Sequence, residues 1–289
     1  MNREPSSHSR EGLELLLHQA WELGDEGDFP GMANQLRDAL ESYPDEPALL
    51  CWLGVAEREL GMEGVAYERF KQALALDPED AHILATAGSG LARFDDPEAE
   101  PAMRAAALMA PDLALARWMY GAYLAREGYA AEARRELDEA RALDPESPVV
   151  AYESGVAHAL ADDLEAALGE LERAVELAPE DGWYRLVLGL ALVEADRLED
   201  ALAELDAAAR LEPEDVEAQL SASLAHAALG NEDEAWEFLE RARFPAQGTD
   251  VLSISEAEER VEDGPEAAER FLRRTLSPSA LRERLQARP

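Results

Sequence analysis

Alanine recurs along this chain at an almost fixed interval, and this periodicity restricts the possible folds more than any other feature. The intervals are 34, 33, 34, 34, 34 and 34 residues, and the alanines are Ala39, Ala73, Ala106, Ala140, Ala174, Ala208 and Ala242. A period of this length is typical of stacked supersecondary repeats, each of which packs mainly on its neighbours. The sequence therefore predicts an elongated repeat array and not one globular core.

Three other residue classes keep the same phase. A small residue stands 19 positions before each periodic alanine, or 18 in the third repeat: Ala20, Gly54, Gly88, Gly121, Gly155, Gly189 and Ser223. A larger apolar residue stands three positions before it: Leu36, Phe70, Met103, Leu137, Leu171, Leu205 and Leu239. Proline follows it by five positions in six repeats: Pro44, Pro78, Pro111, Pro145, Pro179 and Pro213. Because small residues let helices approach closely and proline ends a helix, each repeat is predicted to be a pair of helices, and the chain all-α.

This pattern resembles the tetratricopeptide repeat (TPR) family. The clearest repeat, residues 47–80, carries the family signature at Leu53, Gly54, Gly61, Ala66, Phe70, Ala73 and Pro78. The resemblance implies an α-solenoid, a right-handed superhelix of stacked antiparallel helix pairs. We expect an N-terminal tail over 1–12 and seven repeats over 13–248, which start at residues 13, 47, 81, 114, 148, 182 and 216. A degenerate eighth helix pair over 249–277 and a basic C-terminal capping helix over 278–289 complete the predicted order.

The charge of the chain excludes some classes of partner. It has 63 acidic and 26 basic residues, for a formal net charge of −37. Nucleic acids and anionic membrane surfaces are excluded as partners, because binding to phosphate requires clustered cations. The sequence also lacks an apolar stretch of transmembrane length, so we expect a cytoplasmic protein.

The C-terminus departs from this acidic composition. Residues 270–289 contain six arginines and one acidic residue, a charge of +5. One interpretation is a capping helix whose arginines lie against the acidic side of the last repeats. The other is a separate docking tail for an acidic partner. The candidate patch consists of Arg270, Arg273, Arg274, Arg282 and Arg284.

Sequence signals for catalysis are missing. We find no phosphate-binding loop, no dinucleotide fingerprint and no nucleophile elbow. His158 and His226 occupy the same phase two repeats apart and are interpreted as packing residues, while Cys51 is the single cysteine. No acidic residues recur beside the histidines at the spacing of metal ligands. We therefore predict a protein that is not an enzyme, with no catalytic residue, no metal site and no cofactor.

The resemblance implies that the first helix of each repeat lines a concave groove. The candidate partner-binding residues there are Trp21, Val55, Arg93, Trp118, Arg126, Tyr152, Val156, Trp183, Leu186 and Leu190. Tryptophan, tyrosine and arginine are common hot-spot residues, and an exposed apolar stripe indicates a protein-binding surface. The expected ligand is a helical or extended apolar peptide segment, with some negative charge opposite Arg93 and Arg126. The alternative is that these side chains pack between neighbouring first helices.

The resulting prediction is a non-catalytic scaffold or adaptor that binds a protein or peptide in its groove. The alternative is a dedicated, chaperone-like regulatory or assembly subunit of one enzyme or secretion complex. The sequence leaves the oligomeric state open.

Overall fold

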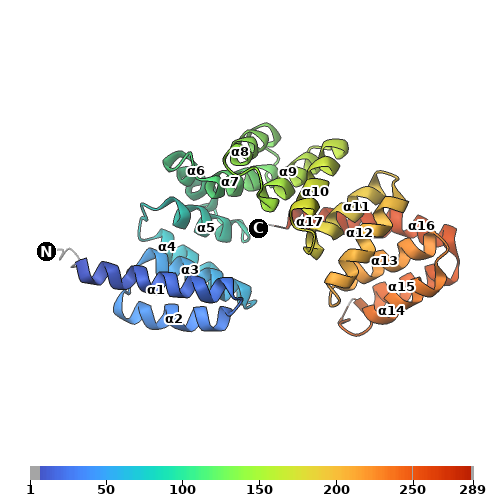
Figure 1. Cartoon of the computed structure of the whole chain (residues 1–289), viewed down its shortest axis with the longest axis horizontal. Helices are drawn as coiled ribbons and strands as arrows, with labels where there is room; N and C mark the ends of the chain where they lie inside the picture. Colours follow the sequence, from blue (N-terminus) through green and yellow to red (C-terminus); the bar gives the residue numbers. More distant parts are fainter. Residues whose placement is uncertain (1–6, 249, 288–289) are drawn as a thin grey trace. The chain divides into compact units, whose positions relative to one another are not determined.

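The computed structural model describes residues 7–248 and 250–287, which form helices and contain no strand. They divide into two compact units, the first ending at Tyr123 and the second covering Leu124–Ala287 (Figure 1). Within each unit, antiparallel helix pairs stack side by side, which is the predicted all-α repeat architecture. None of the helices in these ranges is long and apolar enough to cross a membrane.

The first unit contains three helix pairs and most of one further helix. Its helices are α1 (Ser7–Asp25), α2 (Phe29–Ser42), α3 (Pro47–Glu59), α4 (Glu63–Leu74), α5 (Ala81–Ala92), α6 (Ala99–Met109) and α7 (Ala114–Arg126), whose last turn belongs to the second unit. The odd-numbered helices are the first helices of their repeats and the even-numbered ones the second. Helix α1 already begins at Ser7, inside the predicted tail, and residues 1–6 of that tail lie outside the described part.

The second unit continues this order and then departs from it. Its regular helices are α8 (Ala130–Leu143), α9 (Pro148–Leu160), α10 (Leu164–Leu177), α11 (Gly182–Glu194), α12 (Leu198–Leu211), α13 (Val216–Ala228), α14 (Glu232–Ala242) and α15 (Asp250–Glu262). After them, α16 (Pro265–Phe271), the π-helical stretch η1 (Leu272–Leu276) and α17 (Ser277–Gln286) follow one another without a break. We call residues 265–286 the C-terminal segment.

The predicted eighth helix pair and the predicted capping helix are joined in the structure, because α17 follows η1 without a break. Proline at position 278 suggests a helix break, because its ring clashes with the carbonyl group four residues earlier. In the structure the backbone N–H of Ser277 donates to the carbonyl oxygen of Leu272, five residues earlier. This wider turn lets the helix pass Pro278 without ending. Residues 288–289 of the predicted capping helix lie outside the described part.

The in-phase small residues bring the two helices of a repeat into direct contact. A Cβ atom added to Gly189 would lie 2.7 Å from Leu205, and one added to Gly155 would lie 2.8 Å from Leu171. Both partners are the larger apolar residues three positions before the periodic alanines. In the seventh repeat, Ser223 replaces the glycine, and its hydroxyl donates a 2.8 Å hydrogen bond to the Ala235 carbonyl oxygen across the same contact.

Polar side chains begin several of the first helices. Asp80, Ser147, Asp181 and Asp215 each accept a hydrogen bond from a backbone N–H in the first turn of the helix that follows. Such caps satisfy donors that the helix itself leaves unpaired. The start of each of these helices is therefore determined locally, shortly after the proline that follows the preceding helix.

The turns between paired helices show a further periodic feature. Each of the seven repeats has one residue with positive φ in the turn between its two helices: Gly27, Gly61, Asp95, Gly128, Asp162, Asp196 and Gly230. This left-handed conformation ends a helix and favours glycine, while aspartate tolerates it better than most residues. Glycine at four of these seven positions was the available signal, and the three aspartates obscured it.

The shortened third repeat is held to its neighbour by a buried carboxylate. Asp96 accepts hydrogen bonds from the Tyr67 hydroxyl at 2.7 Å, from the Lys71 ammonium at 2.9 Å and from the backbone N–H of Glu98 at 2.9 Å. The backbone hydrogen bond and the two side chains lower the pKa of Asp96 to about 2. The turn before α6 is thereby attached to α4 of the preceding repeat.

Two glycine-to-alanine substitutions should have opposite effects on stability. Gly189→Ala forces a methyl group against Leu205 and should destabilise the protein by about 1–3 kcal/mol. Gly169→Ala lies inside α10 with no atom within 4 Å of the added Cβ, and should stabilise it by about 0.5–1 kcal/mol. Thermal unfolding followed by circular dichroism measures both. Equal shifts in melting temperature would contradict the close-contact explanation.

The contribution of Asp96 to stability should depend on pH in one direction. Its folded pKa of about 2 lies below the unfolded value of about 3.9, so the ionised form stabilises the fold above that value. Asp96→Asn should lower the melting temperature at pH 7, and this difference from wild type should shrink as the pH falls from about 5 towards 2. The exposed Asp45→Asn serves as the control. A pH-independent difference for Asp96→Asn would rule out the charge as its cause.

Candidate protein-interaction site

The first unit has an open apolar pocket on its first helices. Its volume is about 410 Å³, and its lining comes from α1, α2, α3 and the start of α5: Trp21, Gly24, Asp25, Phe29, Met32, Trp52, Val55 and His82. Trp21 and Trp52 meet edge to face with ring centroids 5.3 Å apart, and Trp21 remains 46% exposed. The structure thus brings together two of the predicted partner-binding residues, Trp21 and Val55.

The other two predicted residues of this unit do not line the pocket. Arg93 makes an ion pair with Glu63 at 2.9 Å. Trp118 is half-buried in α7. The pocket instead uses Trp52, Phe29 and Met32, which the sequence analysis did not select because it considered only the groove positions implied by the family pattern.

In the second unit the predicted stripe is mostly buried. Tyr152, Val156, Leu186 and Leu190 are each at most 5% exposed, while Trp183 keeps 37% of its surface exposed. The first four belong to one apolar cluster with residues of the C-terminal segment, among them Leu272, Ala280, Leu281 and Leu285. The stripe therefore faces a part of the same chain, the C-terminal segment, which one sequence interpretation placed against the acidic side of the last repeats.

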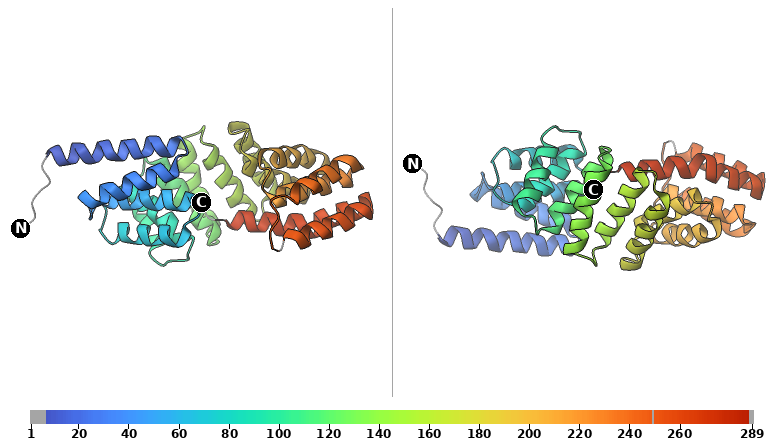
Figure 2. Two further views of the ribbon diagram at one scale, coloured as in Figure 1. Left: turned by 90° about the horizontal axis from the view of Figure 1, so that it is seen from below. Right: turned by 90° about the horizontal axis from the view of Figure 1, so that it is seen from above.

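The C-terminal segment crosses the first helices of the last three repeats. Helix α16 packs on α13, η1 contacts both α13 and α11, and α17 packs on α11 and reaches α9. Figure 2 shows this segment as a long red helix beside the yellow and orange helices of the second unit. We call the surface formed by α9, α11 and α13 the first-helix face. In this structure the face is covered by a helix.

One arginine makes the most specific contact on this face. The Arg284 side chain donates to Glu217 Oε2 at 2.7 Å and to Asp215 Oδ2 at 2.7 Å, and its guanidinium carbon lies 4.5 Å from the centroid of the Trp183 ring. Trp183 Nε1 in turn donates a 2.8 Å hydrogen bond to the Tyr152 hydroxyl, which fixes the orientation of the indole. Two carboxylates and an aromatic face thus form an arginine cage, in which Arg284 is only 8% exposed.

The two acids of this cage have different surroundings. Burial raises the pKa of Glu217 above its usual value, and the nearby Arg284 offsets only part of that rise. Asp215 has a second function, because its Oδ1 accepts the backbone N–H of Ala218 at 3.0 Å and caps α13. The cage is consequently built on a helix start that the repeat itself already requires.

Three more polar contacts attach the C-terminal segment. The Ser277 hydroxyl donates to the Leu190 carbonyl oxygen at 3.0 Å, in a buried position. Arg126 Nε donates to the Ala287 carbonyl oxygen at 2.8 Å, next to the end of α17. Arg273 pairs with Asp196, one of the positive-φ turn residues. Contacts of this kind fix the position of a helix along its groove as well as its orientation.

Arg126 is also bound on its other side. Its guanidinium pairs with Glu153 at 2.7 Å and 3.3 Å, and both side chains are only 2% exposed. Arg93 is paired with Glu63, as described above. Since both arginines are neutralised by acids of the chain, the reason for expecting a negatively charged ligand disappears. The first-helix face of the second unit instead accommodates a basic helix.

The five arginines of the predicted C-terminal patch do not act together. Arg273 and Arg284 point to acids of the second unit, whereas Arg270, Arg274 and Arg282 are exposed. Arg270 and Arg274 border a pocket of about 460 Å³ with Phe271. The structure thus divides these arginines into those that pair with acids of the second unit and those that are exposed.

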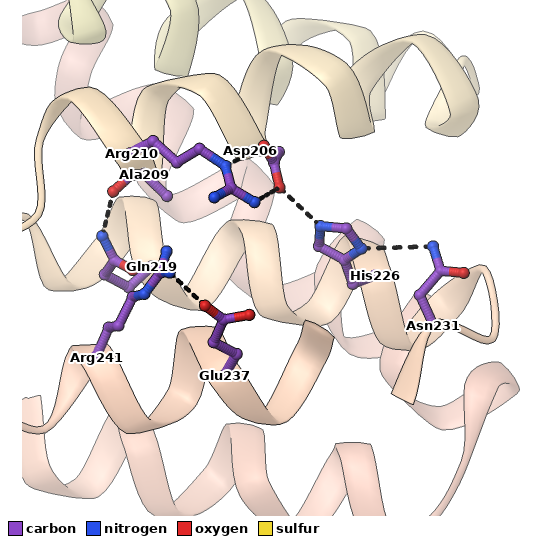
Figure 3. Close-up of polar contacts among 8 residues, drawn as sticks. All are labelled: Asp206, Ala209, Arg210, Gln219, His226, Asn231, Glu237 and Arg241. Atoms are coloured by element: carbon purple, nitrogen blue, oxygen red, sulfur yellow. Dashed lines mark hydrogen bonds and ion pairs between the residues drawn. The ribbon is translucent and has the colours of Figure 1, made fainter. Parts of the chain in front are cut away.

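His226 is a packing residue in this structure. Its Nε2 lies 3.0 Å from Asp206 Oδ1 and its Nδ1 lies 3.4 Å from Asn231 Nδ2 (Figure 3). Its ring also stacks on Phe238. Burial raises the pKa of Asp206, but hydrogen bonds from Arg210 and His226 outweigh this effect and leave it lowered. Within residues 7–248 and 250–287 there is no group of three or more potential metal ligands.

Several solved structures have a similar fold. The APC/C hetero-tetramer of Cut9 and Hcn1 matches with a TM-score of 0.67 at 16% identity, over 82% of this chain and 48% of the matched one. A tetratricopeptide repeat protein from Parabacteroides merdae matches with a TM-score of 0.58 at 15% identity, over 88% and 98% of the two chains. A thermophilic TPR protein from Thermus thermophilus matches with 0.52 at 25% identity, over 62% and 98%. No curated protein matches in sequence.

The sequence itself matches a family model. The model is described as tetratricopeptide repeat, and it matches residues 17–81, 130–182 and 186–249, together more than half of the chain. The unmatched interval between the first two ranges contains the shortened third repeat. With the stacked helix pairs described above, this match shows that the chain belongs to the tetratricopeptide repeat family.

Proposed function

We propose that the chain is a non-catalytic scaffold or adaptor that binds a helical or extended apolar segment of another protein. The observation that carries this proposal is the open pocket of the first unit that Trp21 and Trp52 line together. Exposed tryptophans in a concave apolar site are typical of binding hot spots, because a large contact area is gained with little loss of side-chain entropy.

The composition of the pocket indicates the chemistry of its ligand. Most of its lining is apolar, and the polar side chains are Asp25 at its edge and the exposed His82. An aromatic or branched aliphatic side chain of the ligand would lie against Trp21 and Val55. The shape and the lining thus favour an anchor residue projecting from a helix or an extended segment.

The pocket should control the affinity for such a partner. Trp21→Ala should weaken binding by about tenfold or more, since the exposed indole supplies much of the contact area. The matched control is Leu108→Ala, which removes a 75% exposed apolar side chain from α6 of the same unit and should leave binding unchanged. The measurement is affinity purification with mass spectrometry, followed by titration calorimetry with each recovered partner.

Either of two results would contradict this proposal. One is that every partner binds the Trp21→Ala variant as tightly as the wild type. The other is that Leu108→Ala weakens binding equally, which would indicate nonspecific adhesion. A single partner recovered at constant stoichiometry would identify the chain as a dedicated regulatory or assembly subunit, while several substoichiometric partners would identify it as an adaptor.

A further inference from the structure

We propose that the first-helix face of the second unit is a receptor for a basic amphipathic helix of a partner protein, and that α17 occupies it as an internal surrogate. The inference rests on the proposed function only in that the chain binds other proteins. It concerns a different surface, since the pocket of Trp21 belongs to the first unit.

Helix α17 contacts the face through one regular stripe. Its buried residues are Ser277, Ala280, Leu281, Arg284 and Leu285, each at most 8% exposed. Their spacing of three, one, three and one residues places them on a single side of an α-helix. Between them, Ser279, Arg282, Glu283 and Gln286 are exposed. This is the arrangement of a helix lying in a groove.

The fourth residue of this stripe, Arg284, is charged and buried. Arg284 is enclosed by Asp215, Glu217 and Trp183 at the distances given above. A buried ion pair contributes little net stability, because both charges lose their hydration. Its main effect is selective: the cage accepts a guanidinium group and disfavours apolar or acidic side chains. The face therefore has the properties of a recognition site.

The junction before α17 separates a fixed part of the segment from a removable one. Helix α16 packs on α13, and α17 packs on α11 and α9, with the π-helical η1 between them. A π-helical turn is less favourable than an α-helical one and is frequent at functional sites. Release of α17 alone would leave α16 in place over the last regular repeat.

The partner can be described by the residues that it must match. It should present a helix with a small residue, alanine, leucine, arginine and leucine at the positions of Ser277, Ala280, Leu281, Arg284 and Leu285. A basic helix is also attracted by the field of a chain whose formal charge is −37. The attached α17 competes with such a ligand, and the apparent affinity falls in proportion to the fraction of molecules with an open face.

The test uses the full-length chain and a fluorescently labelled synthetic peptide with the sequence of residues 272–287. Fluorescence anisotropy measures its affinity for the wild type and for Arg284→Ala, which weakens the attachment of α17. A second variant, Arg284→Lys, keeps the charge but loses the planar fork. The matched control is Arg282→Ala, which removes an exposed arginine two residues away on the same helix. Circular dichroism and melting temperature establish that each variant is folded.

The affinity for the peptide should rise when Arg284 is replaced and fall when the acids that bind it are replaced. Arg284→Ala should bind the peptide about tenfold more tightly than the wild type, and Arg284→Lys should be intermediate. Arg282→Ala should match the wild type. Adding Asp215→Asn and Glu217→Gln to Arg284→Ala should reduce its affinity about tenfold or more, while asparagine retains the cap of α13. A peptide with alanine at the position of Arg284 should lose a similar factor.

Three outcomes would overturn the inference. If folded Arg284→Ala binds the peptide no more tightly than the wild type, α17 is a permanent part of the core. If the cage variants leave its affinity unchanged, the face does not recognise arginine. If Arg284→Ala forms a concentration-dependent dimer in light scattering, the occupant is a second copy of this chain. None of these results affects the binding of partners at Trp21, so the two proposals fail separately.

Discussion

The structure depends on the close approach of two helices at a small residue. In the fifth and sixth repeats the glycine of the first helix leaves just enough space for the leucine of the second, so that the helices meet without a gap or a clash. Because this contact recurs in phase, each pair presents its first helix to the next pair in the same way. The first helices that carry the stripe are therefore held by a contact on an adjacent side, since the stripe residues stand three positions before and one after the glycine.

Local periodicity explains what could be predicted from the sequence. The helix pairs, their caps and the contact of Gly189 with Leu205 all lie within about one repeat length, so a single repeat contains the whole signal. The contacts of the C-terminal segment with the first-helix face span more than one repeat length. Arg284 meets Glu217 and Asp215 across 67 and 69 residues, and no repeat pattern relates these positions. Phase placed the stripe residues on the first helices, but the segment that covers them could not be found from phase alone.

The first helices of the two units therefore differ in what contacts their tryptophans. In the first unit, Trp21 is exposed and borders an open pocket. In the second, Trp183 has an arginine above its ring and a tyrosine hydroxyl on its indole nitrogen. The repeat pattern does not distinguish the two tryptophans, because both stand at groove positions of a first helix. Part of their difference comes from the basic C-terminal segment, which supplies Arg284.

The turns between paired helices carry a separate consequence. Four of the seven have glycine at the positive-φ position, and the aspartates elsewhere accept a less favourable backbone conformation in exchange for a carboxylate. At Asp196 that carboxylate binds Arg273, so a position usually reserved for chain reversal also holds a neighbouring helix. The same backbone site occurs once per repeat, at the rim and away from the glycine–leucine contacts. An array of this kind can gain or lose a carboxylate one turn at a time, by exchanging glycine and aspartate, while its interior remains as it is.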